Sequence, residues 1–211
     1  MEPYQTTFST WNQLASLYQE KFMDVDLYDD TYDRFCQLVD KPNARVLELG
    51  CGPGNITRYL LSKRPDFILE ATDAAPNMVQ LAQINNPTAT CYVLDCRDLD
   101  QVSRTYDAVI CGFCLPYLSE EDCQKLIYDS ATVLTAGGIL YLSFIEGDPQ
   151  KSGYETSSNG EHTLYIQYHQ THSLTAILRQ NGFELVEGIQ KSYPSHEKAI
   201  ATHTILLARK I

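Results

Sequence analysis

Apolar side chains follow two spacings along the chain, and each spacing predicts one kind of element. Near the start they recur every three or four residues and predict a helix over residues 11–22, with Thr10 as its N-cap. The apolar face of that helix consists of Trp11, Leu14, Ala15, Tyr18 and Phe22. A second helix is expected from about Leu27 to Val39, ahead of Pro42.

From residue 45 onward, short apolar runs alternate with helical stretches. The runs predict strands at residues 46–49, 67–72, 90–94, 106–111 and 139–145, and the stretches predict helices at residues 56–62, 76–85 and 120–134. We expect Ser119 to cap the last of these helices and Gly137–Gly138 to end it. Strands that alternate with helices predict a parallel sheet with helices on both faces, which is a three-layer α/β fold.

After residue 146 the pattern loosens. Residues 147–160 are polar and predict a loop that ends in a turn at Asn159–Gly160. A strand is expected at 163–168, followed by a short helix with Ser173 as its cap. The apolar runs at 183–189 and 202–208 have no helix-sized link between them, so they predict an antiparallel pair of strands at one side of the sheet.

Composition and charge limit the class of protein. The 211 residues are 44% hydrophobic and 20% charged, which predicts one globular domain over residues 1–211. The net charge of −11 disfavours nucleic acid and anionic membrane surfaces as partners. The sequence has no run of 18 apolar residues, which is about the length needed to span a membrane, and its first residues do not resemble a signal peptide. We therefore expect a cytoplasmic protein.

The seven cysteines favour reduced, buried thiols, because their number is odd and most stand in apolar runs. Cys111 and Cys114 form a C-x-x-C pair, which is also found in redox and zinc sites. No second pair stands at zinc spacing, and the pair follows a strand instead of opening a helix. We therefore expect core thiols and no metal site.

The chemistry lies where the predicted strands end. The first strand leads into Gly50-x-Gly52-x-Gly54 and a helix, a turn that lets a ligand approach the backbone. Asp73 ends the second strand and can accept the hydroxyl hydrogens of a ribose. Asp95 ends the third strand and can accept from the exocyclic amine of adenine, with the Cys96 N–H facing a ring nitrogen. Together these strand ends predict an adenosine site.

The acidic groups around that site distinguish between adenosine cofactors. A dinucleotide fingerprint would have Gly or Ala where this chain has Asn55. Glu48, Asp73 and Asp95 suit a cationic ligand with a sulfonium and an ammonium group better than a diphosphate. Glu48 stands inside an apolar strand, so we expect it to be hydrogen-bonded to the N–H groups of the glycine loop and to the cofactor.

These segments carry a family resemblance. Residues 48–54, ELGCGPG, resemble motif I of the class I S-adenosylmethionine-dependent methyltransferases, and residues 73–78 resemble their second motif with Ala75 in place of the usual Ser. Residues 95–99 and 106–110 are similar to the third and fourth motifs. Residues 134–138 are similar to the L-x-P-G-G turn, with Ala136 where Pro is common. The resemblance extends over nearly the whole chain.

The resemblance implies a Rossmann-like sheet of seven strands, six of them parallel and one near the end reversed. It implies a helical cap at residues 1–42, a cofactor-binding half at 43–146 and a substrate-side half at 147–211. S-adenosylmethionine would be the cofactor and S-adenosylhomocysteine the product. The residues expected at the cofactor are Trp11, Tyr18, Glu48, Gly50, Cys51, Gly52, Gly54, Asn55, Asp73, Ala74, Met78, Asp95, Cys96, Arg97, Cys111 and Phe113.

Within this set the resemblance implies particular roles. The three glycines would wrap the amino-acid part of the cofactor, and the backbone around Cys111 would meet its ammonium group. Trp11 and Tyr18 would lie near the sulfonium, where an aromatic face over a cation is favourable, although core burial alone also explains both rings. Met78 is interpreted as packing beside the adenine.

The methyl acceptor and the catalytic residues are less defined. A general base is needed only when the nucleophile holds its proton tightly, and the candidates are His169 and Tyr117, with His162, Tyr168 and His172 near the same mouth. We expect methylation of an O, N or C nucleophile of a small molecule, by a monomer or homodimer. Two alternatives stay open, a non-catalytic cofactor-binding protein on the same scaffold and a nucleotide-dependent oxidoreductase.

Overall fold

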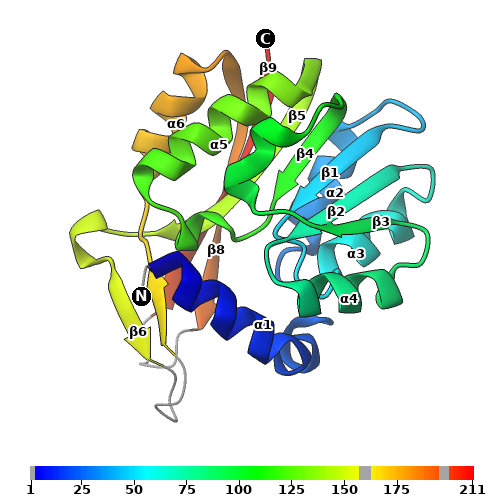
Figure 1. Ribbon diagram of the computed structural model, residues 1–211. Coiled ribbons are helices and arrows are strands. Elements are labelled where there is room, and N and C mark those ends of the chain that lie inside the picture. Colours follow the sequence, from blue (N-terminus) through cyan, green and yellow to red (C-terminus); the bar gives the residue numbers. More distant parts are fainter. Residues whose placement is uncertain (1–2, 157–162, 195–199) are drawn as a thin grey trace.

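The computed structural model describes residues 3–156, 163–194 and 200–211 (Figure 1). Its α-helices are α1 (Pro3–Phe22), α2 (Asp29–Leu38), α3 (Asn55–Lys63), α4 (Pro76–Asn85), α5 (Glu120–Val133) and α6 (Thr171–Gln180). Its strands are β1 (Arg45–Leu49), β2 (Ile68–Asp73), β3 (Thr90–Val93), β4 (Tyr106–Cys111), β5 (Leu134–Glu146), β6 (Gly153–Thr156), β7 (Thr163–Ile166), β8 (Phe183–Pro194) and β9 (Ile200–Lys210). Short 3₁₀ helices cover Cys96–Gln101, Leu115–Tyr117 and Pro149–Lys151.

The main sheet has the predicted topology. Its seven strands lie in the order β3-β2-β1-β4-β5-β9-β8, and β1 to β5 are parallel to one another. Strand β9 is antiparallel to both β5 and β8, so six strands share one direction and β9 alone is reversed. The Rossmann-like α/β fold and the closing antiparallel pair are therefore confirmed.

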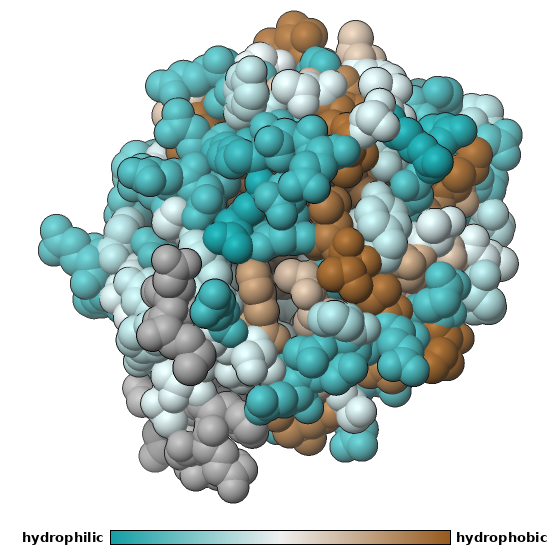
Figure 2. Space-filling model, in the orientation of Figure 1, coloured by the Kyte–Doolittle hydropathy of each residue, from teal (hydrophilic) through white to brown (hydrophobic). Residues whose placement is uncertain are grey.

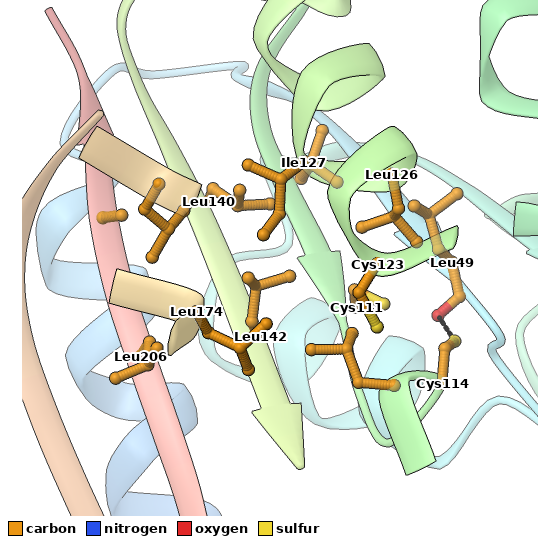
Figure 3. Packing of buried hydrophobic residues seen from close by; sticks show 14 of the residues in the cluster. Leu49, Cys111, Cys114, Cys123, Leu126, Ile127, Leu140, Leu142, Leu174 and Leu206 are labelled. Atoms are coloured by element: carbon orange, nitrogen blue, oxygen red, sulfur yellow. Dashed lines mark hydrogen bonds between the residues drawn. The ribbon is translucent and has the colours of Figure 1, made fainter. Parts of the chain in front are cut away.

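Each face of the sheet is covered by helices because the central strands are buried on both sides. Leu47 and Leu49 of β1 face one core with Leu126 and Ile127 of α5, and Figure 3 shows how the leucines of β5, β9 and α6 complete it. Val46, which precedes Leu47, faces the opposite core with residues of α2 and α3. Successive side chains of a strand point to opposite faces, so a continuous apolar run is the expected signature of such a strand.

Three predicted boundaries are wrong. Helix α1 begins at Pro3, so Thr10 lies within it, and its hydroxyl donates to the Thr163 carbonyl at 3.4 Å instead of capping. Ser173 lies inside α6, whose N-cap is Gln170. Gly137–Gly138 lie within β5, which begins directly after α5. The parallel register shifts between Tyr106 and Ala108, so the glycine pair sits at an irregularity of the strand.

The segment after β5 forms more structure than the predicted loop. Strands β6 and β7 pair antiparallel as a separate two-stranded sheet, and α1 lies against β7. The predicted turn at Asn159–Gly160 lies outside the described residues. The predicted Ser119 cap is confirmed, since its hydroxyl accepts from the Asp122 N–H at 3.1 Å. In the described part of the chain, no helix has the length and apolar character needed to cross a membrane.

Candidate functional site

The carboxyl ends of β1 to β4 and helix α1 enclose one hollow, which we call the strand-end pocket. It holds about 770 Å³ of empty space, part of it open to solvent, and in Figure 2 the molecule is hollowed near the middle of this face. The residues around it are Thr7, Phe8, Trp11, Tyr18, Gly50, Gly52, Asp73, Ala74, Ala75, Met78, Leu94, Asp95, Cys96, Gly112, Phe113, Cys114, Tyr117 and Leu118.

The glycine loop after β1 shapes the pocket floor. Gly50 and Gly52 have φ angles of 65° and 53°, and both line the hollow. A side chain at Gly50 would collide with the Cys114 sulfur, whereas a Cβ at Gly52 would point into the pocket and meet only Tyr18, at 3.6 Å. Gly54 instead faces α4, where a Cβ would lie 2.3 Å from the Asn86 amide nitrogen. Gly54 is therefore a packing glycine and does not line the pocket.

Asp73 stands at the centre of the site. One carboxylate oxygen accepts the Gly52 N–H at 2.9 Å and the other accepts the Ala75 N–H at 2.8 Å. Burial raises the pKa of Asp73 above its ordinary value, and these two hydrogen bonds partly oppose the rise. Each oxygen keeps a further lone pair for a ligand hydroxyl.

Asp95 lines the pocket but is already paired. Its carboxylate accepts from the Arg97 guanidinium at 2.6 Å and from the Arg97 backbone N–H at 3.0 Å. The guanidinium lies over the rings of Tyr4 and Phe8 of α1, 3.9 and 5.5 Å from their centroids. The sequence predicted Arg97 at the cofactor, but this residue does not line the pocket. Its guanidinium instead packs against α1 near the end of β3.

The predicted environment of Glu48 is wrong. Glu48 is fully buried and does not line the pocket; its Oε2 accepts the Thr57 hydroxyl at 2.5 Å. Among the described residues its Oε1 has no hydrogen-bond partner. The N–H groups of the glycine loop are used elsewhere, that of Gly52 by Asp73 and that of Cys51 by the Thr72 carbonyl. Burial raises the pKa of Glu48 to about 8.

Aromatic side chains close the pocket from above. The Trp11 ring meets Tyr18 edge-on at 5.4 Å and Tyr117 edge-on at 5.7 Å between centroids. Phe113, after β4, has a positive φ of 57°, and its N–H donates to the Ser143 hydroxyl at 2.8 Å. A left-handed conformation is unusual for a bulky residue and is held here by that bond and by contacts of its ring with Tyr28 and His203.

The two catalytic candidates differ in position. Tyr117 lines the pocket, but His169 is buried behind it, with Nε2 at 2.8 Å from the Leu115 carbonyl and 3.7 Å from the Cys123 sulfur. Burial lowers the pKa of His169. Tyr168 donates to Glu155 at 2.9 Å, His172 is exposed on α6, and His162 lies outside the described residues. His169 is therefore not placed to receive a proton from a molecule in the pocket.

The remaining predicted residues divide in the same way. Ala74, Met78 and Cys96 line the pocket. Cys51 and Cys111 are buried in the cores, and Asn55 begins α3 outside the lining. All seven cysteines are free thiols, and Figure 3 shows Cys114 donating to the Leu49 carbonyl, at 3.2 Å. Among the described residues, no group of three or more His, Cys, Asp or Glu side chains could hold a metal ion.

Sequence reasoning missed several residues of the lining: Thr7, Phe8, Ala75, Leu94, Gly112, Cys114 and Leu118. The sequence pattern could have identified Phe8. Tyr4, Phe8 and Trp11 stand at i, i+4 and i+7, so the apolar face of the first helix extends toward the N-terminus. Thr7 adjoins Phe8 on the same helix, and the other five lie directly beside predicted residues, where spacing alone does not show which of two neighbours faces the ligand.

Comparison with known proteins gives a consistent result. Residues 46–138 match a family model described as a methyltransferase domain. A trans-aconitate 2-methyltransferase of Mycobacterium ulcerans is 39% identical over 106 residues, which is 50% of this chain and 38% of that protein. The chain thus spans less than half the length of that relative.

Solved structures share the fold. The N-methyltransferase NodS from Bradyrhizobium japonicum, in complex with S-adenosylhomocysteine, has a TM-score of 0.71 at 15% identity, covering 97% of this chain and 98% of that one. Magnesium protoporphyrin IX methyltransferase from Synechocystis, with bound S-adenosylmethionine, has a TM-score of 0.64 at 20% identity, covering 88% of this chain and 80% of that one. At these identities the likeness establishes the fold.

Proposed function

We propose that this chain, whose residues 46–138 match a family model described as a methyltransferase domain, transfers a methyl group from S-adenosylmethionine to an O, N or C nucleophile of a small molecule. The observation that carries the proposal is Asp73, which joins the glycine loop through Gly52 and turns its carboxylate toward an open pocket at the strand ends. This pairing suits a ligand with a ribose diol and a compact, flexible amino-acid tail.

The pocket fits that cofactor at its centre and at its floor. Asp73 would hold the ribose, and Gly50 and Gly52 would leave room for the amino-acid part, since a Cβ at Gly52 would fill this space. Cys96 and Met78 would border the adenine, and Trp11, Tyr18 and Phe113 would surround the sulfonium end. Asp95 already accepts hydrogen bonds from Arg97, so a contact with the adenine amine would share its carboxylate between the two partners.

The cofactor, when bound, supplies an electrophilic methyl carbon. The residues of this chain would position and shield it. The strand ends would hold the adenosine, the aromatic side chains of α1 would keep water from the reacting atoms, and the glycine loop would hold the amino-acid part so that the sulfonium is aligned with the acceptor. Tyr117, at the pocket wall, is the remaining catalytic candidate.

A thermal-shift experiment separates this function from a nucleotide-dependent oxidoreductase. S-adenosylhomocysteine at about 100 times its dissociation constant is expected to stabilise the protein by about 3 kcal/mol and to raise the melting temperature. NAD is expected to leave it unchanged, because its diphosphate would face Asp73 and Asp95. The opposite ranking of the two ligands would favour the oxidoreductase. Binding without turnover of any acceptor, measured with labelled cofactor on a metabolite panel, would favour a non-catalytic binding protein.

The setting of the enzyme is part of the same proposal. Seven free thiols suit a reducing compartment, so we propose a cytoplasmic protein. A net charge of −11 supports a small-molecule acceptor in preference to nucleic acid. We further propose one domain over residues 1–211 that acts as a monomer or homodimer, with residues 1–42 as a cap, 43–146 for the cofactor and 147–211 toward the acceptor.

A further inference from the structure

We propose that the methyl acceptor is an uncharged aromatic nitrogen compound, such as a pyridine-type heterocycle or an aryl amine, and not a carboxylate or an alcohol. The inference rests on the proposed methyl transfer and adds the chemical class of the acceptor. It is carried by three properties of the strand-end pocket: its charge, its aromatic wall and the groups that could remove a proton.

The charge of the pocket opposes an anionic acceptor. Its ionisable acidic groups are Asp73 and Asp95, and among the described residues no Lys, Arg or His lines it. The nearby guanidinium of Arg97 is held by Asp95 and covered by Tyr4 and Phe8. A carboxylate in the pocket would lose its hydration without gaining a cationic partner. A neutral acceptor avoids this cost.

The aromatic wall suits a planar ring. Trp11 and Tyr18 come from α1, Phe113 from the end of β4, and Tyr117 from the 3₁₀ helix that follows. Trp11 meets Tyr18 and Tyr117 edge-on, and all of these rings line the pocket, so a planar aromatic acceptor would pack against their faces or edges. The same faces attract the positive charge of a methylated ring nitrogen.

The described residues offer no base to an alcohol. His169 is buried behind the pocket on the Leu115 carbonyl, and His203 lies outside the lining, with Nδ1 at 2.6 Å from the Tyr28 hydroxyl. Burial lowers the pKa of His203 to about 4 and raises the pKa values of Tyr18 and Tyr117 well above the ordinary range. In the described part of the chain, no side chain is therefore placed to take the proton of an alcohol, whereas a pyridine-type nitrogen has no proton to lose.

The transfer to such a nitrogen balances without a protein base. The nitrogen lone pair forms the new C–N bond as the S–C bond breaks, and the electron pair of that bond returns to sulfur to give the neutral thioether S-adenosylhomocysteine. The positive charge passes from sulfur to the ring nitrogen, so no proton moves. With an aryl amine, the proton leaves to water after the methyl group has been transferred.

Binding and turnover with three probes test the class. Quinoline, catechol and trans-aconitate are titrated into the protein saturated with S-adenosylhomocysteine, and each is then incubated with labelled S-adenosylmethionine. We expect quinoline to bind at least about tenfold more tightly than trans-aconitate and to yield N-methylquinolinium, identified by mass spectrometry. Tighter binding of trans-aconitate, or faster methylation of catechol than of quinoline, would overturn the proposal. Failure of S-adenosylhomocysteine itself to bind would instead overturn the proposed function, so the two failures are distinguishable.

A charge substitution in the wall provides a second test. Tyr117→Arg adds a cation to the pocket, and Tyr128→Arg makes the same change at an exposed position of α5. We expect Tyr117→Arg to weaken quinoline binding and strengthen trans-aconitate binding, each at least about fivefold, while Tyr128→Arg changes neither. Tyr117→Phe keeps the ring and is expected to keep quinoline affinity within about twofold, which tests the aromatic contact if the arginine variant does not fold. A large loss of quinoline affinity in Tyr117→Phe would contradict a contact through the ring face.

Discussion

Replacing Asp73 by alanine is expected to weaken the binding of S-adenosylhomocysteine at least about tenfold in calorimetry, because hydrogen bonds to a charged group contribute about 1.5–3 kcal/mol. The variant would lose the hydrogen bonds from the ribose to the carboxylate, and the N–H groups of Gly52 and Ala75 would lose their acceptor. Asp73→Asn keeps an acceptor oxygen for one of these groups and is expected to lose less affinity. Asp98→Ala removes an exposed carboxylate that does not line the pocket and serves as the control.

The affinity loss must be separated from a loss of fold. Unfolding of each variant without ligand gives its own stability, and two unpaired N–H groups are expected to cost about 1–3 kcal/mol each where they stay buried. Binding should also weaken in the wild-type protein as the pH falls toward the pKa of Asp73, which burial raises. Wild-type affinity in Asp73→Ala would exclude Asp73 from the site.

The sheet could be predicted because its signal is local. The run Val46–Leu49 is buried on both faces of the sheet and ends at a glycine, so the sequence predicts both the strand and the end of the strand at which a ligand would bind. Residues 46–138 match a methyltransferase family model, in line with the resemblance read from the motifs, and the solved structures share the predicted fold. Asp73 and the first two glycines lie at the pocket because the strand ends alone position them.

The predictions that failed depend on contacts between distant segments. Arg97 was expected at the cofactor, but rings from α1 and the carboxylate of Asp95 hold it elsewhere. His169 was placed by its position in an irregular segment, and its partner Leu115 lies 54 residues away along the chain. Spacing along a sequence gives the face of an element, but it does not show which polar group from another element reaches a side chain first.

Glu48 shows how such a distant contact changes the chemistry of a motif residue. The side chain of the acidic residue before the glycine loop was expected to bond to the loop, yet in the described part of the chain the only hydrogen bond of this carboxyl group comes from Thr57 of α3. With one oxygen unpaired and the side chain fully buried, the charged form is disfavoured, and the pKa is raised from 4.5 to about 8. The protonated form is therefore favoured in the folded protein over a range of pH in which the unfolded chain is ionised.

Glu48→Gln is expected to flatten the dependence of stability on pH. A carboxyl group whose pKa is raised in the fold makes its full contribution to stability at pH values below its pKa in the unfolded chain, near 4.5. That contribution is lost as the pH rises toward the folded-state pKa of about 8. The loss is on the order of 4 kcal/mol for one fully buried carboxyl group. Glutamine has nearly the same shape, accepts the Thr57 hydroxyl and carries no charge, so it should retain stability at pH 8.

Urea unfolding of both proteins from pH 5 to pH 8.5 measures the difference. We expect the two proteins to have similar free energies of unfolding at pH 5. As the pH rises, we expect Glu48→Gln to become increasingly more stable than the wild type. Glu121→Gln, at an exposed position in the first turn of α5, removes one carboxylate at the surface and controls for net charge. Parallel curves for wild type and Glu48→Gln would mean that Glu48 is ionised in the fold, and its unpaired oxygen would then need a partner beyond the described residues.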